Sequence, residues 1–463
     1  MAPLGGFGLV RVDSRAVPEP WFDELSELLA IPSVSADPER AADVSRAAEW
    51  LAGFIRGAGG SAEVVPTDTQ PLILGDLPAS DVSQGQSPGP VPTVLVYGHV
   101  DVQPPDPLEL WESEPFALEQ RGEWLFGRGI VDDKGQLYML VRAAADLAAA
   151  GELPVNVRFA CDSEEETGGH QIVDFLAADE RGADAALIFD SGMTTRGVPE
   201  FAVATRGLVY FHVTVRTGAR DLHSGIFGGA ALNATHALMA ALSAVQARNG
   251  RLPEPLRAGI APPSDEERAA WAELVPGEQM LAEAAVSPLD REAAEEFYLR
   301  TTAEPSLEVN GVAGGSPRLQ KTVLPVLAEA NVSIRLAPGQ DVDEIGAAVE
   351  RLLREAAPEG AELDVQRLSS SPAGLVPPDA QAITLAQDAF EHTMGRRPLL
   401  VRSGGTLPIV PALVDKGIPT IVTGFATPES SIHSPNERLL AEYLPLGIET
   451  AKELYRRLAA LGR

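Results

Sequence analysis

Short apolar runs alternate with amphipathic stretches along the N-terminal part of the chain. The runs Thr93–Tyr97, 155–160 and Ala185–Phe189 have the length and composition of buried strands. Residues 78–92 are rich in Pro, Gly, Ser and Asp, which predicts a loop. Strands that alternate with helices predict an α/β unit with a mostly parallel sheet. The spacing of apolar residues predicts the helices at 21–30, 39–57, 136–150 and 169–178.

A different pattern follows, in which longer strands are combined with helices. A long β-branched strand is predicted over residues 201–216. The other elements predicted in this part are helices at 230–246 and 342–356 and strands at 328–336 and 362–368. The α/β alternation then returns at 378–393, 399–402, 409–416 and 420–422, before a last helix at 444–461. We therefore expect a small α+β domain, residues 204–371, inserted into an α/β domain formed by residues 1–203 and 372–463.

Charge and cysteine content exclude several classes of protein. The 463 residues carry a formal net charge of −30, and no cluster of Lys or Arg offers a basic face to nucleic acid. No apolar run approaches the roughly 20 residues of a membrane helix, and residues 1–10 lack the features of a signal peptide. The single cysteine, Cys161, rules out a disulfide within the chain. We therefore expect a cytoplasmic protein that binds neither nucleic acid nor membrane.

Three adjacent glutamates, Glu164, Glu165 and Glu166, follow the predicted strand 155–160. Carboxylates buried together are costly without a countercharge, which a divalent metal ion would supply. A metal-dependent hydrolase needs one carboxylate that binds metal and another that accepts a proton from water. The alternative is a solvated acidic start of a helix, which the helix dipole favours.

Further candidate ligands lie beside predicted strand ends. His99 and Asp101 follow Thr93–Tyr97, and ligands of α/β proteins gather at the carboxyl ends of strands. Asp101 could orient His99 from behind, or both residues could belong to an ordinary surface turn. Asp132 and Asp133 lie in a Gly-rich loop before a predicted helix, where an N-cap would explain one of them.

Asp190 and His433 complete the set of candidate metal ligands. Asp190 ends the strand Ala185–Phe189, where a turn or an N-cap is the alternative, and His433 lies in a polar loop. Three carboxylates and a hydroxide balance two divalent ions, and histidines serve as neutral ligands. Glu165 then remains as the base. The five proposed ligands are His99, Asp132, Glu166, Asp190 and His433.

Three residues of the later chain are candidates for substrate contacts. His223 could donate a hydrogen bond to an oxyanion, although an ordinary loop histidine is the favoured interpretation from its local sequence. Arg335 interrupts an apolar strand and suits the recognition of a carboxylate, with an edge-strand ion pair as the alternative. Thr406 begins a predicted helix, where it could contact a carboxylate or only cap the helix.

These residues, in this order, resemble the zinc-dependent exopeptidase family of carnosine dipeptidases, carboxypeptidase G and aminoacylase. The resemblance extends from about Trp21 to the C-terminal helix. It rests on motifs that are weak singly and specific together: His99-Val-Asp101, Gly127-Arg-Gly-Ile-Val-Asp-Asp-Lys-Gly135, Glu165-Glu-Thr-Gly168, Phe189-Asp190-Ser, Leu222-His-Ser-Gly225 and Ile432-His433-Ser-Pro. It implies the two-domain α/β fold of exopeptidases with two co-catalytic zinc ions. The catalytic domain of this fold has a mostly parallel sheet, and a domain that serves as lid and dimerisation surface is inserted into it.

The resemblance also implies roles for the metal-site residues. Asp132 corresponds to the carboxylate that bridges two ions, and Glu165 corresponds to the general base. One ion would be completed by His99 and Asp190, and the other by Glu166 and His433. Asp101 corresponds to a residue that supports the site from behind the first histidine.

The remaining implied roles concern the substrate and a second subunit. His223 corresponds to a histidine that reaches the partner's active site across a homodimer interface. Thr322, Arg335 and Thr406 resemble substrate contacts of the dipeptidase branch, in which the arginine holds the terminal carboxylate. We therefore expect a dinuclear metallohydrolase that cleaves dipeptides or other short peptides. Two Zn²⁺ ions are expected, and Mn²⁺ or Co²⁺ would accept the same ligands.

Other functions remain open from the sequence. An N-acyl amino-acid deacylase or another amidohydrolase would use the same metal ligands with a different acyl pocket. A metal- or peptide-binding protein without catalysis, and a purely structural acidic scaffold, are alternatives from other classes. Neither of these last two explains why Glu165 accompanies the ordered ligand motifs.

Overall fold

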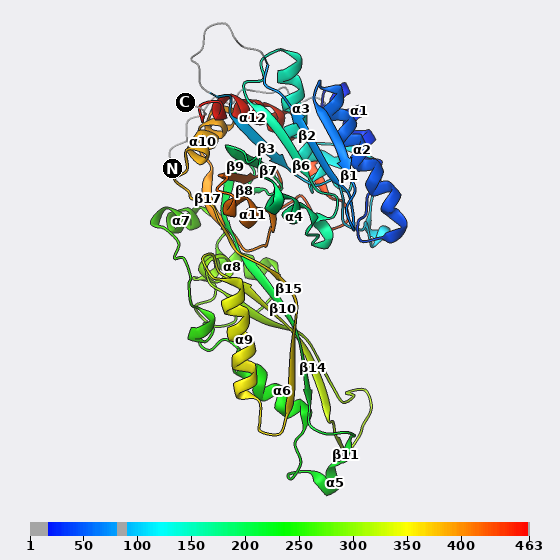
Figure 1. The fold of residues 1–463 in the computed structure, drawn as a ribbon, viewed down its shortest axis with the longest axis vertical. Helices are drawn as coiled ribbons and strands as arrows, with labels where there is room; N and C mark the ends of the chain where they lie inside the picture. The colour runs from blue at the N-terminus through cyan, green and yellow to red at the C-terminus, as the bar shows by residue number, and fades with distance from the viewer. Residues whose placement is uncertain (1–16, 81–89, 462–463) are drawn as a thin grey trace. The chain divides into compact units, whose positions relative to one another are not determined.

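The computed structural model describes residues 17–80 and 90–461. Residues 1–10 and most of the predicted loop at 78–92 therefore lie outside the described residues. The chain divides into two compact units, each built from separate segments (Figure 1). Unit 1 consists of Met1–Ala202, Val376–Leu400 and Ala412–Arg463, and unit 2 consists of Val203–Leu375 and Val401–Pro411.

A mixed sheet forms the centre of unit 1. Its described strands follow the order β1-β2-β6-β3-β7-β18, and the pairs β6/β3, β3/β7 and β7/β18 are parallel. Every residue of β7 is buried, which agrees with a central strand covered on both faces. The strand bounds are β1 Ser61–Val65, β2 Leu72–Leu77, β3 Thr93–Tyr97, β6 Asn156–Cys161, β7 Ala185–Phe189 and β18 Thr420–Thr423.

Helices and two small sheets complete unit 1. Helix α3 packs against α1 and α12, and α12 also packs against α10. The helix bounds are α1 Glu19–Leu29, α2 Ala41–Gly57, α3 Lys134–Ala149, α4 Gln171–Ala178, α10 Gln381–Met394 and α12 Tyr443–Leu458. Helix α11, Ile409–Asp415, begins in the last residues of unit 2 and ends in unit 1. The remaining strands of unit 1 are β4 Glu119–Arg121, β5 Trp124–Phe126, β8 Met193–Thr195 and β19 Arg438–Leu440. Three further strands lie near the unit boundaries: β9 Val198–Thr205, β16 Gly374–Leu375 and β17 Leu399–Ser403.

The parallel strands determine where polar side chains gather in unit 1. Strands β3, β6 and β7 run in the same direction, so their carboxyl ends lie at one edge of the sheet. His99 follows β3, the three glutamates follow β6, and Asp190 follows β7. Residues that are far apart in the sequence are thereby brought to the same edge.

Unit 2 contains an antiparallel sheet with the strand order β12-β14-β10-β15. Strands β10 (Gly207–Arg216) and β14 (Leu327–Leu336) pair over their whole length, with Val209 opposite Ile334. Alternate residues of both strands are buried, as expected for a sheet with one covered face. The outer strands are β12 Ser306–Gly314 and β15 Glu362–Ser371.

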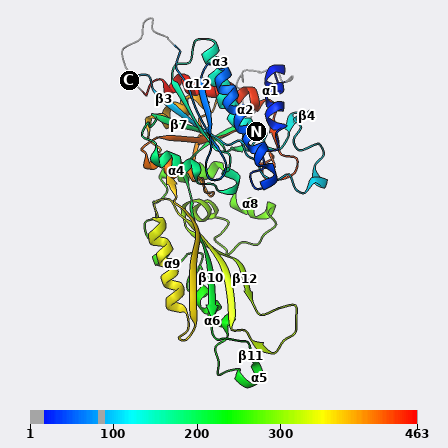
Figure 2. The ribbon, with the colours of Figure 1, turned by 45° about the vertical axis from the view of Figure 1, so that its right-hand side comes forward.

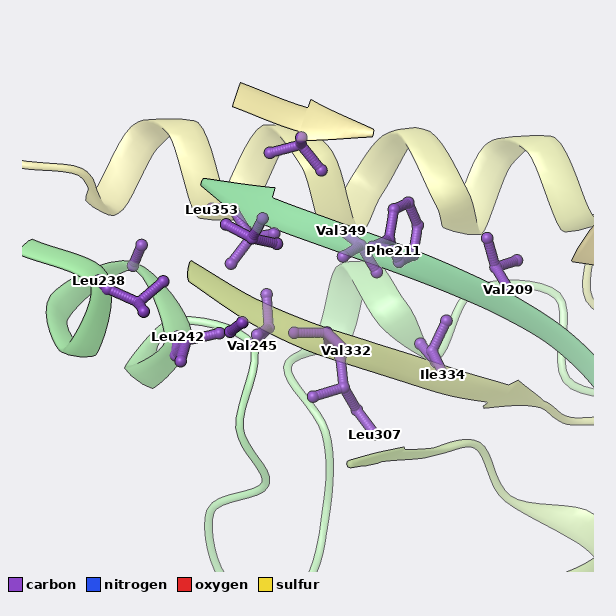
Figure 3. Packing of buried hydrophobic residues seen from close by; sticks show 14 of the residues in the cluster. Val209, Phe211, Leu238, Leu242, Val245, Leu307, Val332, Ile334, Val349 and Leu353 are labelled. Atoms are coloured by element: carbon purple, nitrogen blue, oxygen red, sulfur yellow. The ribbon is translucent and has the colours of Figure 1, made fainter. Parts of the chain in front are cut away.

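Helices α6 (Ala234–Ser243) and α9 (Val342–Ala356) cover this sheet and contact each other. Their apolar side chains meet those of the strands in one cluster, which includes Phe211, Leu238 and Val349 (Figure 3). The apolar residues of α9 recur at helical spacing, so that only one face of this helix is buried. This cluster gives unit 2 a hydrophobic core of its own.

The remaining elements of unit 2 are short. Strands β11 (Leu222–His223) and β13 (Val323–Leu324) form a small pair beside α5 (Ser224–Phe227), at one end of the long strands (Figures 1 and 2). The polar segment at 252–297 contains short helices. Their bounds are η4 Glu254–Leu256, α7 Asp265–Ala270, η5 Trp271–Glu273 and α8 Gly277–Glu283.

The predicted strand at 201–216 is wrong in one respect, because it is two strands. Strand β9 ends at Thr205 and β10 begins at Gly207, with Arg206 between them. Residues typical of strands lie on both sides of Arg206 and Gly207, so the prediction joined the two strands. The predicted strands and helices at 93–97, 185–189 and 342–356 are confirmed with the same bounds.

Candidate metal centre

A first group of possible metal ligands lies at the carboxyl ends of β3 and β7. The Nε2 atom of His99 lies 3.2 Å from Oδ1 of Asp132 and 3.9 Å from Oδ1 of Asp190. One ligand atom from each of these residues lies within 4.8 Å of the other two. Imidazole and carboxylate groups at this separation suit a divalent ion such as zinc.

A second group shares Asp132 with the first. The Nε2 atom of His433 lies 2.9 Å from Oδ2 of Asp132 and 3.1 Å from Oε2 of Glu166. Asp132 therefore directs one carboxylate oxygen toward each group. This is the arrangement that a carboxylate needs to bridge two neighbouring ions.

The charges of these side chains fit cations. Hydrogen bonds to Asp132 and Glu166 raise the pKa of His433 to about 10, so the carboxylates favour positive charge at this position. Burial lowers the pKa of His99, but hydrogen bonds to Asp101 and Asp132 outweigh it and raise this pKa well above its usual value. Glu166 Oε1 is buried and has no hydrogen-bond partner among the described residues. A bound cation would satisfy that oxygen and supply the positive charge.

Glu165 lies beside the two groups and belongs to neither. Burial, together with the carboxylates of Asp190 and Glu166, raises its pKa to about 8, while His99 acts in the opposite direction. Glu164 is 4% exposed, and its Oε1 atom has no partner among the described residues. A buried cluster of this kind does not fit the alternative of a solvated acidic start of a helix.

Asp101 lies directly behind His99. Nδ1 of His99 lies 3.1 Å from the carbonyl oxygen of Asp101 and 3.4 Å from its Oδ1 atom. The Asp101 carboxylate also accepts hydrogen bonds from the backbone amides of Glu165 and Glu166, at 3.3 and 3.2 Å. The Ser35 hydroxyl donates another at 2.6 Å. Asp101 thus connects the candidate ligand His99 to the glutamate segment.

The residues after Asp132 are not the simple helix start that their positions suggested. Asp133 occupies the N-cap position of α3, but its side chain makes no capping hydrogen bond. Its Oδ2 atom instead accepts a hydrogen bond from the backbone amide of His99 at 3.2 Å. The Lys134 ammonium group donates to the carbonyl oxygens of Leu28 and Ile31, at 3.2 and 2.7 Å.

Two other polar residues hold the site and were not predicted. Gln103 donates from Nε2 to Oε2 of Glu166 at 2.7 Å. The carboxylate of Glu437 accepts hydrogen bonds from the loop that carries Asp132. Both residues lie close in sequence to a candidate ligand motif, and this proximity was the only signal of their role.

A separate cluster in unit 2 contains Arg335 and Thr406. Nη1 of Arg335 donates to the hydroxyl oxygen of Thr406 at 2.7 Å, and that hydroxyl donates to the carbonyl oxygen of Arg206 at 2.7 Å. The Arg206 side chain donates to Oγ of Ser306. Ser306 pairs with Arg335 across β12 and β14. Burial and the positive charge of Arg335 lower the pKa of Arg206 to about 10, while the carboxylate of Glu308 acts in the opposite direction. The edge-strand ion pair considered for Arg335 is absent from the described residues, where neither arginine is ion-paired.

The structure also places His223 and Thr322 side by side. His223 pairs with Val323 across β11 and β13, and the amide of Ser224 donates to the carbonyl oxygen of Thr322 at 3.0 Å. Both side chains are exposed. Nδ1 of His223 accepts a hydrogen bond from the amide of Gly225 at 3.0 Å. Within the described part of the chain, no hydrogen bond or ion pair links His223 to Arg335 or Thr406.

Comparison with known protein families identifies the family of the chain. The model of peptidase family M20/M25/M40 matches residues 95–457, which include both candidate ligand groups. The chain belongs to this family. It is therefore a hydrolase of peptide bonds, and the predicted resemblance to the exopeptidases is confirmed.

Curated relatives and a solved structure support this assignment. The chain is 29% identical to Beta-Ala-His dipeptidase of Homo sapiens, over 80% of this chain and 74% of the human protein. It is 26% identical to the Cys-Gly metallodipeptidase DUG1 of Saccharomyces cerevisiae, over 90% of this chain and 91% of the yeast protein. The metallo-carboxypeptidase Sso-CP2 of Sulfolobus solfataricus has the same fold, with a TM-score of 0.81 and 23% identity over 96% of this chain and 100% of that one.

These comparisons confirm the predicted fold class, an α/β fold shared with two-domain metallopeptidases. They favour the peptidase over the amidohydrolase that the sequence left open. Among the described helices, none combines the length and the apolar character required to cross a bilayer.

Proposed function

We propose that this protein is a dipeptidase that requires two divalent metal ions, held by His99, Asp132, Glu166, Asp190 and His433. The sharing of Asp132 between two ligand groups is the observation that carries the metal assignment. The dipeptidase activity named for the human and yeast relatives supports the substrate class. Zinc suits a mixture of imidazole and carboxylate ligands, with manganese or cobalt as other candidates.

Glu165 is the proposed general base. When bound, two cations would make a water molecule more acidic and polarise the carbonyl group of the scissile bond. Glu165 would accept a proton from this water and deliver it to the leaving amine. Its position beside both ligand groups, without membership of either, supports this role. Asp101 would hold His99 and the glutamate segment in place during the reaction.

Arg335 is the proposed partner of the substrate's terminal carboxylate, with Thr406 beside it. Guanidinium groups bind carboxylates through charge-assisted hydrogen bonds. Arg206 and Arg335 repel each other, and neither is ion-paired within the described part of the chain. An anionic substrate group would relieve this repulsion. The preference for an anion supports action at a free carboxyl terminus.

We further propose a cytoplasmic homodimer in which His223 and Thr322 contact the substrate bound to the other subunit. The two residues are neighbours and exposed, as a pair that serves a partner molecule must be. His223 would donate a hydrogen bond to the developing oxyanion. The cytoplasmic location rests on the single buried cysteine, Cys161, which excludes a disulfide within the chain.

A substrate panel with defined metals tests the proposed function. The metal-free protein would be loaded with Zn²⁺, Mn²⁺ or Co²⁺ and assayed on dipeptides, tripeptides and N-acyl amino acids. A dipeptidase would hydrolyse dipeptides with the highest kcat/KM. A preference for N-acyl amino acids would reassign the protein as a deacylase, and no turnover of any substrate would favour a binding protein.

A further inference from the structure

Glu437 carries a fully buried carboxylate that accepts four hydrogen bonds. Oε2 accepts from Nη1 of Arg128 at 2.8 Å and from the amide of Gly129 at 2.9 Å. Oε1 accepts from the amides of Val131 and Asp132, at 2.9 and 3.1 Å. An ionised carboxylate is suited to this position because it offers acceptors and no donor.

All four donors belong to the loop that carries Asp132. The acceptor, Glu437, follows His433 in a loop that lies far from Asp132 in the sequence. The Glu437 side chain therefore joins the two segments whose ligand atoms, Asp132 Oδ2 and His433 Nε2, lie 2.9 Å apart. The Arg128 guanidinium strengthens the connection, because it also donates to the carbonyl oxygen of Ser434 at 3.4 Å.

The His433 loop needs external support. Ser431, His433 and Asn436 have φ values of 56°, 56° and 62°, in the left-handed region that residues other than glycine rarely adopt. Such a backbone persists when its surroundings hold it in place. Asn436 is held on one side by the amide of Glu112, which donates to Asn436 Oδ1 at 2.8 Å. Glu437 supplies the support on the side of the metal centre.

We propose that Glu437 is a positioning residue that fixes Asp132 and His433 relative to each other before the cations bind. This inference rests on the proposed metal centre. Residues that orient metal ligands from behind commonly change metal affinity about 10- to 100-fold when they are altered. The alternative is that Glu437 only stabilises the fold, as any buried ion pair can.

A matched pair of variants separates these two roles. Glu437→Gln keeps the size of the side chain but replaces one acceptor oxygen with an amide donor, which would face the amides of the Asp132 loop. Glu267→Gln is the control, because Glu267 is also buried and accepts hydrogen bonds from an arginine, Arg402, and a backbone amide, that of Ser264. Glu267 lies in unit 2, outside both ligand groups.

The test measures Co²⁺ affinity of the metal-free proteins by competition with a chelator, and their thermal unfolding midpoints. We expect both variants to lower the unfolding midpoint. Only Glu437→Gln should weaken Co²⁺ binding, by about tenfold or more. Binding by Glu437→Gln within twofold of wild type would overturn the proposal.

Two further results are also decisive. If Glu437→Gln does not fold, Glu437→Asp replaces it, because this variant keeps the charge on a shorter side chain. A loss of Co²⁺ affinity of about tenfold or more supports the proposal, and an affinity within twofold of wild type overturns it. A wild-type protein that binds no Co²⁺, Zn²⁺ or Mn²⁺ would refute the proposed metal centre itself. That result differs from equal binding by wild type and variant, which would refute only the role of Glu437.

Discussion

Asp132 and His433 lie far apart in the sequence, yet Oδ2 of Asp132 and Nε2 of His433 are 2.9 Å apart. The other carboxylate oxygen of Asp132 lies 3.2 Å from Nε2 of His99. One carboxylate thus faces two imidazoles from two different segments. A carboxylate in this arrangement can serve two neighbouring cations at one centre.

Glu165→Gln should abolish most turnover without loss of metal. The amide keeps the size of the side chain but cannot accept the proton, and general-base catalysis contributes about 10²- to 10⁴-fold to a rate. We expect kcat to fall by about that factor while metal content, measured by mass spectrometry of the digested protein, stays at the wild-type value. Turnover close to wild type would show that another group is the base.

Cation binding should release a proton from His433. The raised pKa, about 10, means that this imidazole is protonated at pH 8 in the metal-free protein, and a ligand must be deprotonated. Metal affinity should therefore rise with pH until that pKa is reached. Calorimetry at pH 8, in buffers with different ionisation enthalpies, counts the protons released. His433→Asn should release fewer protons than wild type, and an equal release would contradict the assignment.

Arg335→Met should weaken the binding of substrates that have a free carboxyl terminus. A hydrogen bond to a charged group contributes about 1.5–3 kcal/mol, so kcat/KM for dipeptides should fall about 10- to 100-fold. Dipeptide amides should show a much smaller change, because they lack the carboxylate. Arg206→Met should act in the same direction if both guanidinium groups attract the substrate.

Arg257→Met provides the control for the arginine variants. Arg257 lies in the same unit, but its guanidinium is paired with Glu304, with Nη2 2.9 Å from Oε1. We expect this variant to leave the preference for free carboxylates unchanged. An equal loss for dipeptides and their amides in Arg335→Met would exclude carboxylate recognition by Arg335.

Mixed dimers test whether His223 serves the partner's active site. His223→Ala and Glu165→Ala should each be nearly inactive, because one lacks the oxyanion donor and the other lacks the base. If His223 acts across the interface, mixing the two variants creates dimers with one complete site, and part of the activity returns. Mixtures that exchange subunits, shown by mass spectrometry of the intact dimers, but stay inactive would refute shared sites.

The sequence pointed to several residues of the candidate metal centre because they follow predicted strands. His99 and Asp190 follow apolar runs of strand length, and the parallel pairing of those strands brings the two residues together. Asp132 and His433 lie in loops, and the spacing of hydrophobic residues does not reveal the path of a loop. Their residue types, the polar loops around them and the charge balance made them candidates, whereas the bridging role of Asp132 came from the family resemblance. The structure places their side chains in contact.

The supporting residues were harder to predict, because their role depends on contacts distant in sequence. Ser35 reaches Asp101, and Glu437 reaches the loop of Asp132, through hydrogen bonds that leave no local pattern. Strand β12, Ser306–Gly314, was missed because its glycines and an asparagine have low strand propensity. Its pairing with β14 overrides that local preference.

Anomalous diffraction from crystals of the metal-loaded protein would locate the cations directly. We expect two anomalous peaks, about 3.5–4 Å apart, with the Asp132 carboxylate between them, His433 bound to one ion and His99 bound to the other. Peaks at another place in the chain, or no peak near Asp132 in crystals that contain the metal, would contradict the proposed metal centre.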